Sequence, residues 1–446
     1  MRTENPGTTP ASAQLFERPS GGENSLLIQV DDGSVILDDA LRELRALTES
    51  AGARVVGETV HKRRTPDPRT YIGRGKVDEV HQRLHTDGAD LVIVNHTLSA
   101  AQERNLEQAL GCRVLDRVGL ILDIFAQRAR SHEGKLQVEL AQLRHIASRL
   151  VRGWSHLERQ SGGIGTRGPG ETQLEMDRRM IQQRIKQLER RLERVGRQRE
   201  QGRQARRKQE LPVISVVGYT NAGKSTLFNR LTADGEGVHT ADQLFATLDT
   251  TLRRRYLPGG ERVIFSDTVG FIRELPPQLV AAFRSTLEEV TEADLLLHVI
   301  DAADPARQAN MQEVDDVLDE IGAGELPVLC AYNKIDQLDT PARIDRDDQG
   351  QPRAVWLSAA TGEGLDELLQ ASEELVGAAR AHGEIELRPE QGRLRARFYQ
   401  LGAVRAEETT EQGGYRLEVD LPRRELDRLY RKEGLDAALE PAQVRA

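Results

Sequence analysis

Residues 218–225 read GYTNAGKS, a complete phosphate-binding loop placed directly after the apolar run Val213–Val217. A buried strand that ends in a tight glycine turn and opens into a helix, here Thr226–Leu231, points successive backbone N–H groups at one spot. There they can hold the oxygens of a β-phosphate, while Lys224 bridges the β- and γ-phosphates and Ser225 offers a hydroxyl to Mg²⁺. The order of strand, loop and helix therefore predicts a nucleotide-binding domain rather than a chance glycine turn.

A second apolar strand, within Val263–Gly270, ends in Asp-x-x-Gly and predicts the γ-phosphate side of the site. Asp267 can hold Mg²⁺ through water, and the Gly270 N–H can contact the γ-phosphate. The intervening segment 241–251, ADQLFATLDTT, has no strong periodicity and a cluster of hydroxyls, which suits a switch ordered by the γ-phosphate and Mg²⁺. Spacing alone leaves three candidates for its metal-ligating hydroxyl: Thr247, Thr250 and Thr251.

Two further strand ends predict that the base is guanine. Asn333–Asp336 follows the apolar strand Val328–Tyr332. The Asp336 carboxylate can accept both the N1–H and the N2 amine of guanine, whereas adenine presents no such donor pair. A buried carboxylate left unpaired costs about 1–3 kcal/mol or more, so Asp336 favours GTP over ATP. A fourth strand, Val355–Leu357, leads into Ser358-Ala359, where the base would rest on backbone.

The position after Gly270, where many GTPases carry a water-orienting glutamine, holds Phe271. A phenyl ring cannot orient water, so another group or a partner must do so. We expect slow intrinsic hydrolysis, comparable with the roughly 10⁻⁴ to 10⁻³ s⁻¹ of an unassisted GTPase. Asn221 is a candidate helper, because its amide oxygen could hold a monovalent cation such as K⁺ against the phosphates. A turn asparagine that satisfies local backbone is an equally good reading.

The rest of the chain constrains class and compartment. A length of 446 residues allows about three domains. Two separated cysteines, Cys112 and Cys330, favour a reducing cytosol without disulfides. The first two dozen residues resemble a disordered tail rather than a signal peptide. No apolar run approaches the roughly 20 residues of a membrane span.

Strand and helix patterns alternate from Ser25 to Ala126 and predict βα units with a small parallel sheet. We expect strands at 26–30, 54–59, 91–95 and 113–115, and helices at 37–50, 77–84 and 100–110. The turn Tyr71–Lys76, YIGRGK, lacks the full phosphate-loop pattern. It is therefore interpreted as a plain surface connection.

The middle of the chain predicts a helical hairpin. Leucines and other apolar residues recur at heptad spacing from Leu136 to Leu157 and again from Leu174 to Val195. Between them lies the glycine-rich segment 161–171, SGGIGTRGPGE, which is poor material for a helix. Two apolar seams joined by a short connection should pair as an antiparallel hairpin with this loop at its tip.

The hairpin is expected to face a polyanion. Residues 172–208 contain 13 Arg or Lys and 5 Asp or Glu, a net charge of 13 − 5 = +8, whereas the whole chain carries −9. A basic arm on an acidic protein indicates RNA. The competing interpretation, a solvated helix face, is weaker here because the excess is one-sided and lies beside an arginine-bearing loop.

These motifs together resemble the HflX family of the Obg-HflX GTPases. The resemblance rests on 162–175 (GGIGTRGPGETQLE), 218–225, 245–249 (FATLD) and 267–271 (DTVGF), and spans roughly residues 25 to 370. It implies a cytoplasmic, mostly monomeric, Mg²⁺-dependent GTPase that binds the large ribosomal subunit. In several members such a protein splits ribosomes, with the hairpin loop reaching toward the peptidyl transferase centre. The resemblance also favours Thr247 as the switch hydroxyl.

The expected site follows from these motifs. Catalytic contributions are predicted for Lys224, Thr247, Gly270 and Asn221, and metal ligation for Ser225, Thr247 and Asp267. The predicted nucleotide contacts are Gly218, Tyr219, Thr220, Asn221, Ala222, Gly223, Lys224, Ser225, Thr226, Phe245, Ala246, Thr247, Leu248, Asp249, Asp267, Thr268, Val269, Gly270, Asn333, Lys334, Asp336, Ser358, Ala359 and Ala360.

We predict an α/β protein with five segments. They are a disordered tail (1–24), a small parallel α/β domain (25–126), a long antiparallel helical hairpin (127–210), a mainly parallel GTPase domain with helices on both faces (211–382) and a small α+β domain (383–446). The function expected is a GTPase that couples GTP to ribosome splitting, recycling or subunit biogenesis, contacting ribosomal RNA through the tip Gly162–Glu171 and the helix 172–208. Two alternatives stay open: a tRNA-modification GTPase, and an RNA-binding scaffold that does not hydrolyse its nucleotide.

Overall fold

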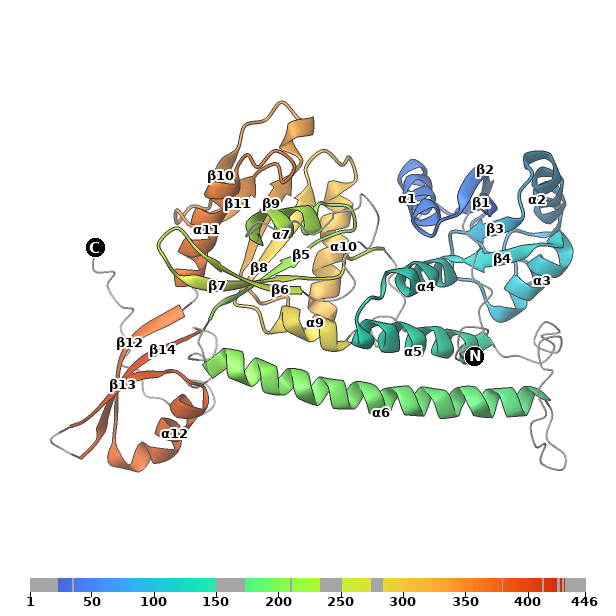
Figure 1. The fold of residues 1–446 in the computed structure, drawn as a ribbon. Helices are drawn as coiled ribbons and strands as arrows, with labels where there is room; N and C mark the ends of the chain where they lie inside the picture. Colours follow the sequence, from blue (N-terminus) through green and yellow to red (C-terminus); the bar gives the residue numbers. More distant parts are fainter. Residues whose placement is uncertain are drawn as a thin grey trace, which may run out of the picture. The chain divides into compact units, whose positions relative to one another are not determined.

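The computed structural model describes residues 23–33, 36–149, 173–208, 211–232, 251–273, 284–378, 380–410, 413–422, 426 and 429 (Figure 1). The chain divides into two compact units, residues 1–127 with 138–185, and residues 128–137 with 186–446. Among the residues described, no helix is both long and apolar enough to cross a membrane.

The first unit contains a four-stranded parallel sheet with the strand order β2-β1-β3-β4. Its elements are β1 (Asn24–Asp31), α1 (Leu37–Ser50), β2 (Arg54–Lys62), α2 (Arg74–Asp87), β3 (Leu91–Val94), α3 (Ala100–Leu110), β4 (Arg113–Asp116) and α4 (Arg117–Arg128). The predicted parallel βα architecture is confirmed. Helix α4, to which the pattern assigned no element, is buried over most of its length from Val118 to Phe125.

Two long helices follow, α5 (His132–Arg149) and α6 (Gln173–Lys208). Within the first unit the predicted seam positions Leu140, Leu143 and Ile181 are buried. An ion pair between Glu139 and Arg184, 2.7 Å, joins the two helices. The end of the first predicted helix, up to Leu157, and the tip Gly162–Glu171 lie outside the described residues.

The second unit is built on a seven-stranded sheet with the order β10-β11-β9-β8-β5-β7-β6. Its elements are β5 (Val213–Val217), α7 (Lys224–Thr232), β6 (Thr251–Tyr256), β7 (Arg262–Asp267), α9 (Arg284–Thr291), β8 (Leu295–Asp301), α10 (Arg307–Glu320), β9 (Val328–Asn333), η3 (Ile335–Gln337), β10 (Arg343–Arg346), β11 (Pro352–Trp356) and α11 (Leu365–Ala378). The five inner strands are parallel, and β6 and β10 pair antiparallel at the edges.

Helices cover both faces of this sheet, as the GTPase-domain prediction requires. One core joins α7 and α11 to the strands through Leu227, Leu368 and Phe265. The other joins α9 and α10 through Val290, Val314 and Leu296. Because alternate residues of a strand point to opposite faces, a fully apolar run such as β8 can fill both cores.

The C-terminal part is a small α+β domain, as expected. Its antiparallel sheet has the order β12-β14-β13. The elements are β12 (Arg380–Leu387), η4 (Pro389–Gln391), α12 (Gly392–Gln400), β13 (Val404–Thr409) and β14 (Tyr415–Pro422). Leu394 and Phe398 of α12 pack with Leu417 and Val419 of the sheet.

Candidate functional site

The predicted phosphate loop lies between the carboxyl end of β5 and the start of α7. Two of its glycines are required by geometry: Gly218 has φ 144° and Gly223 has φ 94°. A Cβ on Gly218 would lie 2.3 Å from the Val299 carbonyl oxygen, and one on Gly223 would lie 2.2 Å from Asn333 Nδ2. Asn221 has a left-handed φ of 61°, which asparagine tolerates better than most residues. The loop is therefore a tight turn closely surrounded by neighbouring strand ends.

Lys224 is buried under this loop and is 6% exposed. Its Nζ donates a hydrogen bond to the Tyr219 carbonyl oxygen at 2.6 Å. Burial lowers the pKa of Lys224 to about 8, and the nearby Asp267 carboxylate opposes that shift. A cation held without full solvation is well placed to gain energy from phosphate oxygens.

Two of the three predicted metal ligands, Ser225 and Asp267, lie side by side. Ser225 Oγ donates to Asp267 Oδ2 at 3.3 Å, so a hydroxyl and a carboxylate from separate elements are adjacent. Oxygen donors of this kind suit Mg²⁺. The third predicted ligand, Thr247, and its neighbours Phe245, Ala246, Leu248 and Asp249 lie outside the described residues.

Gly270 lies against the phosphate loop. A Cβ there would be 3.0 Å from Lys224 Nζ and 3.3 Å from Thr220 Cα. The following side chain, Phe271, is 2% exposed and packs in the core that contains Val290 and Leu318. The ring therefore points into the core and takes no part in orienting water.

The two base-recognition segments are tied to the phosphate loop. Asn333 Nδ2 donates to the Ala222 carbonyl oxygen at 2.8 Å, and Asn333 Oδ1 accepts from the Ala359 N–H at 2.8 Å. The hydroxyl of Ser358 donates to Asp336 Oδ1 at 2.5 Å. Asp336 itself is exposed, which leaves its carboxylate accessible to an incoming base. One asparagine thus holds three loops in register.

The other predicted contacts occupy the same loops. Thr220, Ala222 and Gly223 lie in the phosphate loop, Thr226 in the first turn of α7, Thr268 and Val269 after β7, and Ala360 after Ala359. Thr268 Oγ1 donates to the Val216 carbonyl oxygen at 2.6 Å, and the Ala360 carbonyl oxygen accepts from Arg230 Nη2 at 2.6 Å. The described site residues thus lie in or beside four loops, after β5, β7, β9 and β11, which are linked by the hydrogen bonds of Ser225 and Asn333.

Sequence reasoning missed the contribution of β8. Asp301, at its end, forms an ion pair with Lys334, 2.6 Å between Oδ2 and Nζ. Lys334 has a left-handed φ of 69°, so this pair fixes a residue in an uncommon conformation. The apolar run 295–300, LLLHVI, followed by Asp301 is the pattern that signals this strand and its polar end.

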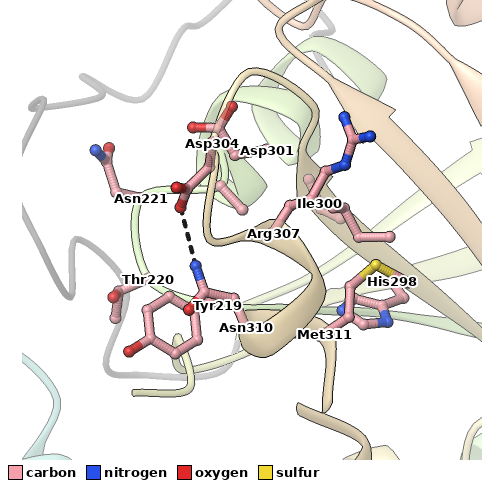
Figure 2. Close-up of a pocket in the computed structure, with 12 residues that line it drawn as sticks. Tyr219, Thr220, Asn221, His298, Ile300, Asp301, Asp304, Arg307, Asn310 and Met311 are labelled. Atoms are coloured by element: carbon pink, nitrogen blue, oxygen red, sulfur yellow. Dashed lines mark hydrogen bonds between the residues drawn. The ribbon is translucent and has the colours of Figure 1, made fainter. Parts of the chain in front are cut away.

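A pocket lies between the phosphate loop, the end of β8 and the start of α10 (Figure 2). It is lined by Tyr219, Thr220, Asn221, Ala222, His298, Val299, Ile300, Asp301, Asp304, Arg307, Asn310 and Met311. Burial lowers the pKa of His298 to about 4, and the charge of Lys224 acts in the same direction. The imidazole is therefore neutral at physiological pH.

Four family models match successive parts of the chain. They are described as GTP-binding GTPase N-terminal (residues 38–126), GTP-binding GTPase Middle Region (128–206), 50S ribosome-binding GTPase (213–334) and HflX C-terminal domain (344–442). Together they account for most of the chain from the first sheet to the C-terminal domain.

Known proteins resemble the chain over nearly its whole length. It is 53% identical to GTPase HflX of Escherichia coli K12 over 94% of this chain and 98% of that protein. It is 46% identical to GTPase HflX of Magnetococcus marinus over 87% of this chain and 90% of that protein. The solved structure of a GTP-binding protein from Sulfolobus solfataricus in complex with GDP is 25% identical, with a TM-score of 0.42, over 80% of this chain and 99% of that one. A superposition this loose carries no argument about domain arrangement.

Proposed function

This chain is a GTP-hydrolysing enzyme of the HflX family, and from that premise we propose that it binds the large ribosomal subunit and couples GTP binding and hydrolysis to ribosome splitting, recycling or subunit biogenesis. The observation that carries the proposal is a guanine-nucleotide site formed in the same chain as a strongly basic helix. Membership of a GTP-hydrolysing family supports this proposal over a scaffold that leaves its nucleotide intact.

The geometry supports a division of roles in the nucleotide site. Loop N–H groups and Lys224 would hold the β- and γ-phosphates. Asp336 would read guanine, with Ser358 bonding one carboxylate oxygen at 2.5 Å and so orienting the group. Lys334, held by Asp301, would lie beside the base. We infer that Gly270 contacts the γ-phosphate through its N–H, because it lies against Lys224.

Mg²⁺ would be held by Ser225, Thr247 and Asp267, of which the first and last are adjacent. When bound, it neutralises charge on the β- and γ-phosphate oxygens.

Asn221 would hold K⁺ in the same region. If it does, potassium should raise basal hydrolysis well above sodium, and Asn221→Ala should abolish that difference. Equal rates in the two salts would refute the cation role.

The hairpin is proposed as the ribosome-contacting part. Helix α6 covers most of the segment whose net charge is +8, and Arg190, Arg191, Arg194 and Arg197 lie along it. We expect the tip Gly162–Glu171 to supply the specific fit to ribosomal RNA and the basic helix to supply electrostatic attraction. The protein is proposed to act as a cytoplasmic monomer with the five segments predicted above.

Single-turnover GTP hydrolysis with and without purified large subunits tests this function. Because Phe271 is buried, we expect slow hydrolysis alone and strong stimulation by the subunits. Identical rates in the two conditions would refute the coupling to the ribosome.

Two variants separate the parts of the hairpin. Reversing the charges of Arg190, Arg191, Arg194 and Arg197 should weaken binding and flatten its salt dependence. Replacing 163–170 with a Gly-Ser linker should preserve association and lower subunit-stimulated hydrolysis or splitting by roughly tenfold. Full activity of the tip-replaced variant would reduce the loop to a connector.

A further inference from the structure

The segment after Gly270 is fastened to the phosphate loop by backbone hydrogen bonds. The Phe271 N–H donates to the Gly218 carbonyl oxygen at 3.1 Å, and the Thr220 N–H donates to the Phe271 carbonyl oxygen at 2.8 Å. These bonds form a parallel bridge between Tyr219 and Phe271 outside the named strands. The orientation of the peptide that joins Gly270 to Phe271 is therefore set by the phosphate loop.

Two side chains extend this attachment to Arg273, two residues beyond Phe271. The Tyr219 hydroxyl accepts a hydrogen bond from the Arg273 N–H at 3.0 Å. The Arg273 guanidinium donates through Nη2 to Asn310 Oδ1 at 3.1 Å. A connection therefore runs from the phosphate loop through Arg273 to helix α10.

Asn310 is in turn held at the start of α10. Its Nδ2 donates to Asp304 Oδ2 at 2.9 Å, the bond drawn as a dashed line in Figure 2. The other oxygen of Asp304 accepts from the Ala306 N–H at 2.9 Å. The hydrogen bond from Asn310 Nδ2 to Asp304 thus fixes the orientation of the amide, and Asn310 Oδ1 faces Arg273.

Movement at Arg273 should reach Gly270 because the intervening residues are packed. Phe271 is 2% exposed and Ile272 is 1% exposed. Neither side chain can rotate away without opening a core, which typically costs several kcal/mol for a large apolar residue. The backbone is therefore held at both Phe271 and Arg273, directly after Gly270.

We propose that Tyr219, through its hydroxyl, and Asn310 are positioning residues that fix Arg273, and through it aim the Gly270 N–H at the γ-phosphate. Tyr219 lies in the phosphate loop, but its hydroxyl and the Asn310 amide contact Arg273. The inference rests on the proposed γ-phosphate contact of Gly270. It assigns to α10 a part in distinguishing GTP from GDP.

The two nucleotides should respond differently when the attachment is weakened. GDP would be held by the phosphate loop, Asn333 and Asp336, none of which depends on Arg273. GTP would use the Gly270 N–H in addition. Loss of the Tyr219 hydroxyl or the Asn310 amide should therefore lower the preference for GTP and slow hydrolysis, while GDP binding stays unchanged.

The experiment uses the full chain with Tyr219→Phe, Asn310→Ala and the double variant. Phenylalanine keeps the ring that packs beside Phe271, so it removes the hydroxyl alone. We expect GDP Kd within about twofold of the wild type, and the Kd of a non-hydrolysable GTP analogue to rise about three- to tenfold, the loss of roughly one hydrogen bond. Single-turnover hydrolysis should fall by a similar factor. The double variant should lose less than the product of the single effects, because both act through Arg273.

Tyr256→Phe is the matched control, since Tyr256 is 64% exposed on β6 and should change none of these values. A lower melting temperature for Tyr219→Phe with an unchanged ratio of GTP-analogue to GDP affinity would assign the hydroxyl a structural role and overturn the proposal. The measurement is made without ribosomes. A negative result would therefore overturn this proposal alone, because the proposed ribosomal function is tested separately by subunit stimulation.

Discussion

The seven-stranded and four-stranded sheets differ in whether the polar groups at the carboxyl ends of their parallel strands are exposed or buried. In the seven-stranded sheet, the loops at that edge are tied to each other through Asn333 but leave Asp336 exposed. In the four-stranded sheet, Asn95, Asp116 and Arg117 at the same edge are buried and bonded to internal partners. Both sheets follow the rule that polar residues gather where parallel strands end. The exposed Asp336 carboxylate is available to a ligand, whereas these buried groups of the four-stranded sheet are not, so the first edge is called open and the second closed.

The closed edge is built from two buried networks. Arg149, at the end of α5, forms ion pairs with Glu103 and with Asp116, the latter at 2.5 Å, and donates to the Leu98 carbonyl oxygen at 3.2 Å. In the second network Arg117 donates to Asn95 Oδ1 at 2.7 Å, and the Asn95 amide donates to Gln29 at 2.7 Å. The first network fastens the hairpin's first helix to the sheet.

The two buried cations differ in the charge of their partners: Arg149 pairs with two carboxylates, whereas the hydrogen bond of Lys224 goes to a neutral carbonyl oxygen. Arg149 forms ion pairs with Glu103 and Asp116, and even so burial lowers the pKa of Arg149 to about 10 and raises that of Asp116 to about 6. Lys224 donates to the neutral Tyr219 carbonyl oxygen, and burial lowers its pKa to about 8 despite the nearby Asp267. Removing the two cations should therefore have opposite consequences for stability and for binding.

The largest effect is expected for Arg149→Met. Without the guanidinium, Asp116 and Glu103 remain buried without their cation, which should lower the free energy of unfolding by about 3–5 kcal/mol. Urea unfolding measures this, and GDP affinity should stay within about twofold. Lys135→Met is the matched control, because Lys135 is exposed on the same helix. A loss of stability no greater than in the control would show that the ion pairs do not hold this edge.

The opposite pattern is expected for Lys224→Met. The buried cation is poorly solvated, so its removal should leave the ligand-free protein at least as stable as the wild type. Affinity for GDP and GTP should fall by about 3 kcal/mol, roughly a hundredfold or more, because the charge-assisted bond to the β-phosphate is lost and, in GTP, the one to the γ-phosphate as well. Isothermal titration measures the loss, with exposed Lys186→Met as the control. Tight binding by Lys224→Met would place the phosphate site elsewhere.

The sequence predicts the open edge far better than the closed one. Phosphate loops and base-reading motifs need fixed residue types at fixed local spacing, so Gly218–Ser225 and Asn333–Asp336 could be placed without a structure. The network of Arg149, Asp116 and Glu103 joins residues 13 to 46 positions apart, and no local pattern reports such pairs. Only the folded chain shows that they meet.

Periodicity explains two of the elements to which the sequence patterns assigned no range. Helix α4 is buried over nearly its whole length, so it lacks the polar stripe that identifies an amphipathic helix. Strand β8 is central and covered on both faces, so it has no alternation. As a consequence Asp301, which holds Lys334, was absent from the predicted site.

An intermediate effect is expected at the open edge for Asp336→Asn. An amide donates where the carboxylate accepted, so guanine nucleotides should bind about 10- to 100-fold more weakly, equivalent to about 1–3 kcal/mol. Xanthine nucleotides should gain correspondingly. Competition binding with GDP and xanthosine diphosphate measures the exchange, and Asp339→Asn, also exposed and three residues further on, serves as the control. Unchanged GDP affinity would show that another group reads the base.

The smallest predicted effect is a pH dependence of stability and of nucleotide affinity that arises from Lys224 in the seven-stranded sheet's phosphate loop. Because Lys224 has a pKa of about 8 in the ligand-free protein, well below its value in an unfolded chain, the folded state binds fewer protons between pH 8 and the unfolded pKa. The ligand-free protein should therefore gain stability from this group as the pH rises through that window. Phosphate oxygens favour the charged ammonium, so nucleotide binding should take up a proton there and weaken as the pH rises.

Between pH 7 and pH 9 the fraction of ligand-free protein with protonated Lys224 falls about tenfold, which sets the expected loss of GDP affinity. Titration calorimetry in buffers of different ionisation enthalpy measures the proton uptake directly. The residual affinity of Lys224→Met should lack this dependence, and an equal pH dependence in that variant would assign the titration to a group other than Lys224.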